Sequence, residues 1–250
     1  MLSKAKIKYI QSLDLKKNRD SDKVFIAEGF KIVEEFIEKF RCRLLLGTHD
    51  WLNAHPHIQA EEIIEVSQEE LSRASLQKTP QEVLGVFEQP RYQTDFNTPQ
   101  KELCLALDTI QNPGNLGTIV RLADWFGIEH IFCSPSTVDI FNPKTIQATM
   151  GALARVQVHY CSLTDLVKNI PSTPVYGTFL DGENIYKKTL PSYGLIIMGN
   201  EGKGISPELE KFINNRLFIP NYPIGRPTSE SLNVAIATAI VCAEFRRQNS

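Results

Sequence analysis

From Ile196 to Gly204 the chain reads Ile-Ile-Met-Gly-Asn-Glu-Gly-Lys-Gly, a short apolar run that breaks into a loop with three glycines. Gly199, Gly202 and Gly204 carry no Cβ, so this loop can approach a ligand or another backbone segment closely. Glu201 supplies the one carboxylate of the loop. The pattern predicts a buried strand followed by a binding loop whose contacts come mostly from the main chain.

A second loop of the same kind lies farther along the chain. The apolar run that ends at Ile219 leads into a stretch rich in Pro, Gly, Ser and Asn, and a helical pattern follows over about 232–247. Ser231 and Asn233 lie at the mouth of this final helix. We expect both loops to belong to one site.

A third segment, about 80 residues upstream by count, completes this site. Residues 103–107 have the pattern of a buried strand, and Asn115 has the position of an N-cap for a helix over 116–126. Gly127 is a plausible stop for that helix. Arg121 lies midway along it beside the apolar face, where an ordinary surface arginine is the alternative to a functional one.

The composition bounds the class of protein. With 42% hydrophobic and 22% charged residues, the 250-residue chain can bury the core of one large or two modest domains. A net charge of −2 excludes a uniformly basic coat, although the first 23 residues hold seven basic and three acidic side chains. The N-terminus has no signal-peptide core, and no apolar run reaches the roughly 18 residues that span a bilayer. We expect a cytoplasmic protein without a membrane segment.

Several common sites are excluded because their motifs are missing. The five cysteines are widely spaced without a C-x-x-C pair, so we expect neither a metal site nor a disulfide framework. The 199–204 loop is not a P-loop, because its glycine spacing differs and Lys203 is followed by glycine rather than Ser or Thr. No G-x-G-x-x-G, G-x-S-x-G or H-E-x-x-H occurs. What remains is a glycine-rich site with Arg, Glu, Ser and Asn side chains.

The N-terminal part alternates strand and helix patterns. An amphipathic helix is expected over 30–40, and Ser67 with Glu70 has the spacing of a capping box. The expected strands are 24–27, 44–46, 63–66 and 83–87.

This alternation predicts an α/β protein of two domains. We expect a small α/β domain over residues 1–90, a linker rich in Pro and polar residues over 91–101, and a second α/β domain over 102–250. The basic segment 16–23 is either a solvated loop or an edge that contacts RNA phosphates.

Three segments together resemble the signature of the SpoU/TrmH group of the SPOUT methyltransferases. They are Asn115–Arg121, Ile197–Gly204 and Ile219–Ala235, in the family order and each after a predicted strand. This resemblance covers about residues 102–250. The N-terminal part, with Phe25-Ile-Ala-Glu-Gly-Phe before an amphipathic helix, resembles the small substrate-binding domain often attached to these enzymes.

The resemblance implies an α/β fold whose C-terminal segment threads a loop to form a deep trefoil knot. It implies a 2′-O-methyltransferase that uses S-adenosylmethionine and acts on RNA, with ribosomal RNA favoured because relatives with such an N-terminal domain often act there. It also implies a homodimer that packs its knotted domains together near the C-terminal helix. The residues that would contact the cofactor or line its pocket by position are Thr178, Phe179, Leu180, Met198, Gly199, Gly202, Ile219 and Leu232.

The catalytic residues implied by position are Asn115, Arg121, Glu201, Ser231 and Asn233. A guanidinium has a pKa above ~12 and no acceptor lone pair, so it is a poor general base. We interpret Arg121 as the group that holds the adjacent RNA phosphate and stabilises developing alkoxide charge. Asn115 would orient Arg121 or the ribose, and the other three would fix the loops and contact the substrate.

Three alternatives stay open. The enzyme could act on transfer RNA, or the chain could be a binding module that holds RNA or cofactor without methyl transfer. A nucleotide hydrolase is a third possibility with little support in the sequence. The spacer over 220–230 is longer than in many relatives, which could reshape the RNA entrance.

Overall fold

The computed structural model describes residues 2–223, 226–227, 229 and 231–249, and it divides into two compact units. The first unit consists of the chain up to Arg91 together with Asp139–Ala154. The second consists of Tyr92–Val138 and the chain from Arg155 onward. Both units combine helices and strands, which confirms the predicted α/β class. In the described part of the chain, no helix is both long enough and apolar enough to cross a bilayer.

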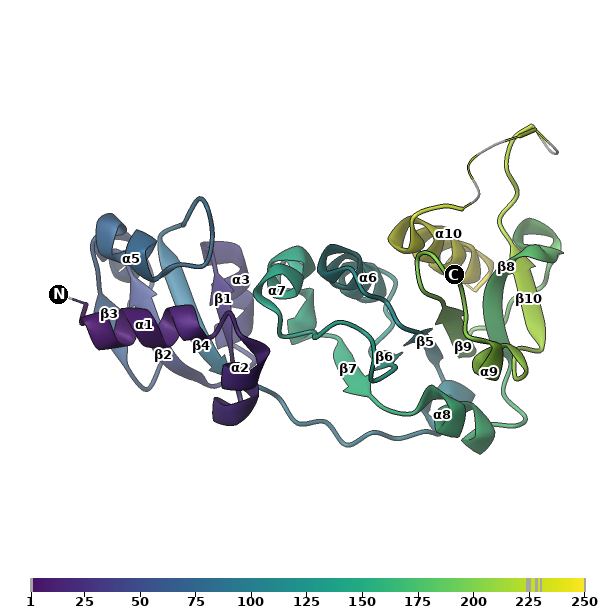
Figure 1. Ribbon diagram of the computed structural model, residues 1–250, viewed down its shortest axis with the longest axis horizontal. Helices are drawn as coiled ribbons and strands as arrows, with labels where there is room; N and C mark the ends of the chain where they lie inside the picture. Colours follow the sequence, from purple (N-terminus) through teal and green to yellow (C-terminus); the bar gives the residue numbers. More distant parts are fainter. Residues whose placement is uncertain (1, 224–225, 228, 230, 250) are drawn as a thin grey trace. The chain divides into compact units, whose positions relative to one another are not determined.

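The first unit is built on a four-stranded sheet in the order β1-β4-β2-β3 (Figure 1). β4 pairs antiparallel with β1 and β2, and β3 joins β2 in parallel. Its strands are β1 (Val24–Glu28), β2 (Cys42–Gly47), β3 (Ile63–Glu65) and β4 (Val83–Glu88). Its helices are α1 (Lys4–Ser12), α2 (Lys16–Asp22), α3 (Phe30–Ile37), α4 (His49–Ala54), α5 (Gln68–Ala74), α7 (Pro143–Thr149) and the 3-10 turn η2 (Ala152–Ala154).

Alternation along β1 separates two cores on the two faces of this sheet. Val24 and Ile26 belong to an aliphatic core that also contains buried residues of α1 and α5. Phe25 points to an aromatic core, where its ring lies 5.6 Å from the Phe36 ring and 5.1 Å from the Phe141 ring. Since Phe141 comes from the returning segment 139–154, this segment completes the core of the first unit.

The basic segment 16–23 is a helix rather than a solvated loop, so that prediction is wrong. α2 places Arg19 inside the first unit, where its side chain is only 1% exposed. The Arg19 guanidinium donates to the carbonyl oxygens of Leu13 and Asp14 and forms an ion pair with Asp139 at 2.7 Å. The lysines at 17 and 23 remain exposed, so the alternative of a phosphate-contacting edge stays a prediction for them.

The second unit is built on a six-stranded sheet in the order β10-β8-β9-β5-β6-β7, in which every neighbouring pair is parallel. Its strands are β5 (Leu103–Leu107), β6 (His130–Cys133), β7 (Gln157–Tyr160), β8 (Val175–Asn184), β9 (Gly194–Met198) and β10 (Asn215–Phe218). Its helices are α6 (Pro113–Trp125), α8 (Leu163–Asn169), α9 (Pro207–Glu210) and α10 (Val234–Gln248), with the 3-10 turns η1 (Thr98–Gln100) and η3 (Ile185–Lys187).

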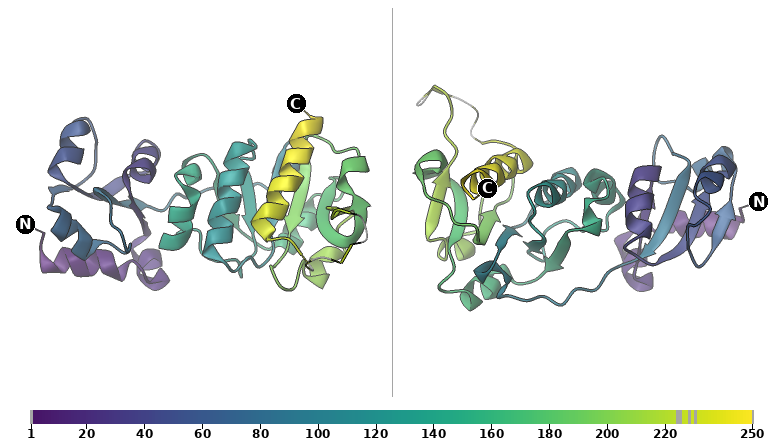
Figure 2. Two further views of the ribbon diagram at one scale, coloured as in Figure 1. Left: turned by 90° about the horizontal axis from the view of Figure 1, so that it is seen from above. Right: turned by 180° about the vertical axis from the view of Figure 1, so that it is seen from behind.

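Helices cover both faces of this parallel sheet, as the near-continuous apolar strands require. α6 and α10 lie side by side on one face, and α8 and α9 lie on the other (Figures 1 and 2). Cys104 and Ala106 of β5 pack with buried residues of α8 and α9.

α6 begins at Pro113 with Asn112 as its N-cap, so the prediction that Asn115 is the cap is wrong. Gly127 follows α6 with a φ of +61°, which confirms it as the stop.

β8 departs from the regular ladder in its middle. Gly177 is its last residue paired with β9, and Gly177 also pairs with Arg216 of β10. The pairing with β10 resumes six residues later, where Glu183 lies opposite Leu217. Residues 178–182 therefore bulge out of the sheet between these two points. A Cβ on Gly182 would lie 2.5 Å from the carbonyl carbon of Leu217, so only glycine fits where the bulge rejoins the ladder.

Candidate functional site

The loop after β9 is closed on itself by hydrogen bonds. The backbone N–H of Asn200 donates to the carbonyl of Gly204, and the Gly204 N–H donates back, both at 2.9 Å. The Asn200 side chain accepts from the backbone N–H groups of Gly202 and Lys203 at 3.0 Å and donates to the Thr109 carbonyl at 2.8 Å. Asn200 therefore fixes both the shape of the loop and its attachment to the end of β5.

Gly199 is the position where this loop crosses itself most closely. A Cβ there would lie 2.3 Å from the Gly204 carbonyl carbon and 2.3 Å from the Ile205 nitrogen, and neither backbone atom can rotate away. We expect Gly199→Ala to weaken cofactor binding by about 10–100-fold, because overpacking of this kind typically costs ~1–3 kcal/mol. Calorimetric titration with S-adenosylmethionine measures this loss.

The matched comparison is Gly202→Ala in the same loop. The nearest atom to a Cβ on Gly202 is Asn200 Oδ1 at 3.8 Å, which is ordinary contact. Gly202→Ala should therefore weaken binding far less than Gly199→Ala. Equal losses in the two variants would contradict the steric explanation.

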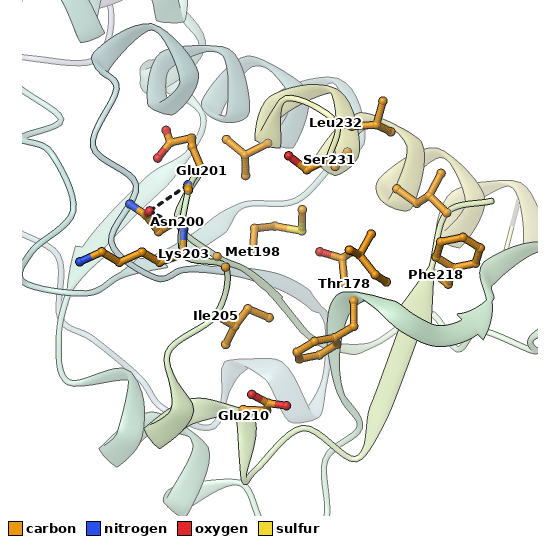
Figure 3. Close-up of a pocket in the computed structure, with 18 of the residues that line it drawn as sticks. Thr178, Met198, Asn200, Glu201, Lys203, Ile205, Glu210, Phe218, Ser231 and Leu232 are labelled. Carbon is orange, nitrogen blue, oxygen red and sulfur yellow. Dashed lines mark hydrogen bonds between the residues drawn. The ribbon is translucent and has the colours of Figure 1, made fainter. Parts of the chain in front are cut away.

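The closed loop forms one wall of a cavity of about 550 Å³. The β8 bulge forms a second wall, and residues at the end of β10 and at the start of α10 form a third. In Figure 3, Glu201 and Ser231 lie toward one end of the cavity, Met198 lies near its middle, and Glu210 lies toward the other end. The eight residues expected at the cofactor all lie on these walls: Thr178, Phe179, Leu180, Met198, Gly199, Gly202, Ile219 and Leu232.

A chain of three side chains connects the three sequence segments beside this cavity. Asn115 Nδ2 donates to Glu201 Oε1 at 2.9 Å, and Asn233 Nδ2 donates to Asn115 Oδ1 at 3.1 Å. Asn233 Oδ1 in turn caps α10 by accepting from Ala235 N at 2.9 Å. Asn115 can reach Glu201 because Asn112 takes the capping role and leaves the Asn115 side chain free for this contact.

Glu201 is held as a carboxylate by this arrangement. Its burial acts to raise its pKa, but hydrogen bonds from Asn115 and from the backbone N–H groups of Gln111 and Asn112 outweigh burial, and the pKa of Glu201 lies below its ordinary value. The ionised Glu201 side chain therefore stabilises the folded protein at every pH above the pKa that it has in the unfolded chain. This stabilisation is lost as the pH falls through the lower pKa that Glu201 has in the folded protein. At neutral pH the carboxylate is ionised.

We expect Glu201→Gln to lower kcat by about 10–100-fold. The variant keeps the shape of the side chain but removes charge-assisted hydrogen bonds worth ~1.5–3 kcal/mol, and its amide donors oppose the donors of Asn115 and the backbone. Single-turnover methyl transfer measures the effect. Glu208→Gln, which neutralises an exposed carboxylate on α9, is the control and should leave kcat unchanged.

The other two expected catalytic residues lie apart from this chain of contacts. Ser231 lies on the cavity wall. Arg121 lies on α6 with an exposed side chain and is not among the residues that line the cavity. Within the described residues, the Arg121 side chain has no hydrogen bond or ion pair, so its guanidinium is available to an external anion.

Sequence reasoning missed several residues that build the site. Asn112 and Asn200 carry the hydrogen bonds that shape it, and their signal was present, since each is an Asn next to Pro or Gly in a predicted loop. Glu210, Arg216 and Phe218 also line the cavity. Their positions gave no signal, because nothing local in the sequence shows that α9 and β10 lie beside the β8 bulge.

A metal site would need several His, Cys, Asp or Glu side chains close together in the part of the chain that the structure describes. No group of three or more His, Cys, Asp or Glu side chains there is placed to hold an ion.

Of the long spacer over 220–230, residues 224, 225, 228 and 230 lie outside the described residues, so the expectation that it reshapes an RNA entrance stays a prediction.

Comparison with known families gives two matches that together cover most of the chain. Residues 102–243 match the model of the SpoU rRNA Methylase family, and residues 4–85 match the MRM3-like substrate binding domain. The 23S rRNA (guanosine(2553)-2′-O)-methyltransferase RlmP of Bacillus subtilis is 30% identical over 96% of both chains. The 23S rRNA (guanosine-2′-O-)-methyltransferase RlmB of Neisseria meningitidis is 28% identical over 61% of both chains.

Solved structures show the same similarity in three dimensions. A structure from Porphyromonas gingivalis, described as an RNA methyltransferase of the TrmH family, matches with a TM-score of 0.90 and 42% identity over 99% of both chains. The AdoMet-bound rRNA methyltransferase of Sinorhizobium meliloti matches with a TM-score of 0.85 and 30% identity over 99% of this chain and 96% of that one.

Proposed function

We propose, on the premise that this chain belongs to the SpoU rRNA methylase family, that it transfers the methyl group of S-adenosylmethionine to a ribose 2′-hydroxyl of ribosomal RNA. The predicted family resemblance is thereby confirmed for both the C-terminal and the N-terminal parts. One observation carries the proposal. The cavity is walled by the loop after β9, the β8 bulge and residues next to β10 and α10, and Glu201 lies at one end, where it accepts a hydrogen bond from Asn115, which in turn accepts one from Asn233.

The cavity fits S-adenosylmethionine in size and chemistry. Its volume of about 550 Å³ lies in the range of small-molecule sites, and its walls combine apolar side chains with loop backbone. The absence of a Cβ at Gly199 keeps the loop wall thin. S-adenosylmethionine supplies an already activated sulfonium methyl group, so the chain's own residues must position the 2′-oxygen and assist the loss of its proton.

We assign the residue roles as follows. Thr178–Leu180, Met198, Gly199, Gly202, Ile219 and Leu232 hold the cofactor. Glu201 and Asn233 fix Asn115, which orients the ribose, and Ser231 contacts the substrate from the cavity wall. Arg121 holds the RNA phosphate next to the target and stabilises the charge that develops on the 2′-oxygen.

The proposed fold includes a deep trefoil knot in the second unit. Two points support it. The loop after β9 and Ile219, which follows β10, line one cavity. The second unit also resembles a family whose members carry this knot. The residue limits 1–90, 91–101 and 102–250 for the substrate-binding domain, linker and methyltransferase domain remain part of the proposal.

We also propose a homodimer that packs α6 and α10 against a second copy. Two large apolar side chains on these adjacent helices face solvent, Trp125 at 83% and Ile236 at 53% exposure. Asn233 binds Asn115 and Arg246 binds Phe126, so the two helices run in the same direction, and Ile236 and Trp125 lie toward opposite ends of the proposed interface. Light scattering on the purified protein tests the dimer.

We propose a guanosine of 23S ribosomal RNA as the target, and the cytoplasm as the place of action. Two relatives, from Bacillus subtilis and Neisseria meningitidis, are named for guanosine 2′-O-methylation of 23S rRNA, and the first matches along nearly the whole chain. The N-terminal unit would deliver the RNA, since it matches a substrate-binding domain.

The test is methyl transfer from labelled S-adenosylmethionine to unmodified 23S rRNA, with transfer RNA as a parallel substrate. We expect alkali-resistant label at a guanosine ribose of 23S rRNA. Label in transfer RNA alone would replace the substrate assignment. Cofactor binding by calorimetry without label in any RNA would favour a binding module, and nucleotide hydrolysis in place of methyl transfer would overturn the proposal.

A further inference from the structure

Within the described residues, no strand pairs with the β8 bulge, although the bulge forms one wall of the cavity. β9 pairs with β8 only as far as Gly177, and β10 skips residues 178–182 between Arg216 and Leu217. Thr178, Phe179 and Leu180 of the bulge line the cavity. Because none of residues 178–182 is paired with β9 or β10, side-chain contacts contribute to the position of this wall.

Arg216 supplies those contacts from the point where the ladder breaks. Its guanidinium carbon lies 3.5 Å from the centre of the Phe179 ring, so the planar group stacks on the ring face. Nη2 binds Asp181 Oδ1 at 2.5 Å, and Nη1 binds Glu210 Oε1 of α9 at 2.6 Å. The Arg216 side chain thus joins Phe179 and Asp181 of the bulge to Glu210 of α9, which also lines the cavity.

We propose that Arg216 is a positioning residue for the cofactor: it clamps the β8 bulge so that Phe179 and its neighbours stand ready to receive S-adenosylmethionine. This inference rests on the cavity being the cofactor site. The guanidinium is committed to Asp181 and Glu210, so it shapes the wall rather than serving as a free anion site. A lysine would retain the charge but could neither stack as a plane nor bind two carboxylates in a fork.

The clamp acts on cofactor affinity and leaves the chemical step alone. We expect Arg216→Gln to raise the Kd for S-adenosylmethionine by about tenfold, because it removes a cation–π contact and two partly exposed ion pairs that each contribute modestly. At saturating cofactor, kcat and the KM for RNA should match those of the wild type. Arg216→Lys should recover only part of the affinity.

A double-mutant cycle separates the clamp from a general loss of structure. Asp181→Asn should weaken binding in the wild type but add little in the Arg216→Gln background, because the shared contact is already gone. Arg155→Gln is the matched control, since it removes an arginine ion pair with Asp124 elsewhere in the same unit. It should leave the Kd unchanged.

The outcomes distinguish the clamp from the proposed function. If wild-type protein binds S-adenosylmethionine and methylates RNA while Arg216→Gln keeps the same Kd, the clamp is wrong and the function stands. Additive losses in the double-mutant cycle, or a fall in kcat at saturating cofactor, also overturn the clamp. If wild-type protein binds no S-adenosylmethionine, the proposed function itself fails.

Discussion

Replacing Arg121 with alanine should lower kcat for methyl transfer by about 100–1000-fold and leave the Kd for S-adenosylmethionine unchanged. Loss of one preorganised donor to a developing negative charge typically costs ~2.7–4 kcal/mol of transition-state stabilisation. Arg121 is exposed on α6 and is not among the cavity-lining residues, so its removal disturbs neither the cofactor walls nor any side-chain hydrogen bond in the described part of the chain. Single-turnover transfer and calorimetry, measured on the same preparation, give the two quantities.

Two further variants sharpen this result. Arg121→Lys keeps the charge but loses the planar fork that matches a phosphate, so its rate should fall between those of the wild type and Arg121→Ala. Lys168→Ala removes an exposed positive charge from α8 of the same unit and controls for a general loss of RNA attraction. Near-wild-type turnover in Arg121→Ala would remove Arg121 from the catalytic site.

Asp139→Ala should lower the free energy of unfolding by about 3–5 kcal/mol, the usual consequence of leaving a buried charge without its partner. Arg19 is almost fully buried, and Asp139 is its ion-pair partner at 2.7 Å. The remaining contacts of Arg19 are carbonyl oxygens of Leu13 and Asp14, which carry no full negative charge. Denaturant unfolding monitored by circular dichroism measures the loss.

The controls for this prediction come from the same cluster. Lys16 also approaches Asp139, at 3.9 Å, but its side chain is 63% exposed, so Lys16→Ala should cost less than about 1 kcal/mol. The double variant Arg19→Met with Asp139→Leu should recover much of the loss, since apolar replacements remove the buried charge altogether. A cost for Asp139→Ala as small as that of Lys16→Ala would show that Arg19 does not depend on Asp139.

The strands and most helix ends could be predicted because their signals are local. The capping box of Ser67 and Glu70 is present as expected, and Asn142 caps α7 ahead of Pro143. Apolar runs placed β5 and β9 correctly, since a parallel sheet covered on both faces needs continuously apolar strands. Two of the three family segments line the cavity, and the third supplies Asn115, which binds Glu201 beside it.

What sequence could not provide depends on contacts between distant residues. Arg19 looked like part of a solvated basic run because its partner lies 120 residues away. Asn115 looked like the cap of α6, whereas Asn112 satisfies the first N–H groups and releases Asn115 toward Glu201. The clamp of Arg216 was equally hidden, because the β8 bulge arises from a change of register that no local pattern records.

The chain's return to the first unit between Asp139 and Ala154 has a consequence for protein engineering and for recombination between relatives. A chimera made by joining a foreign N-terminal segment to this methyltransferase at residue 91 would inherit Phe141 and Asp139 from one parent and the pockets that receive them from the other. An exchange of RNA specificity between such enzymes therefore requires that the segment up to Arg91 and the segment Asp139–Ala154 be transferred together.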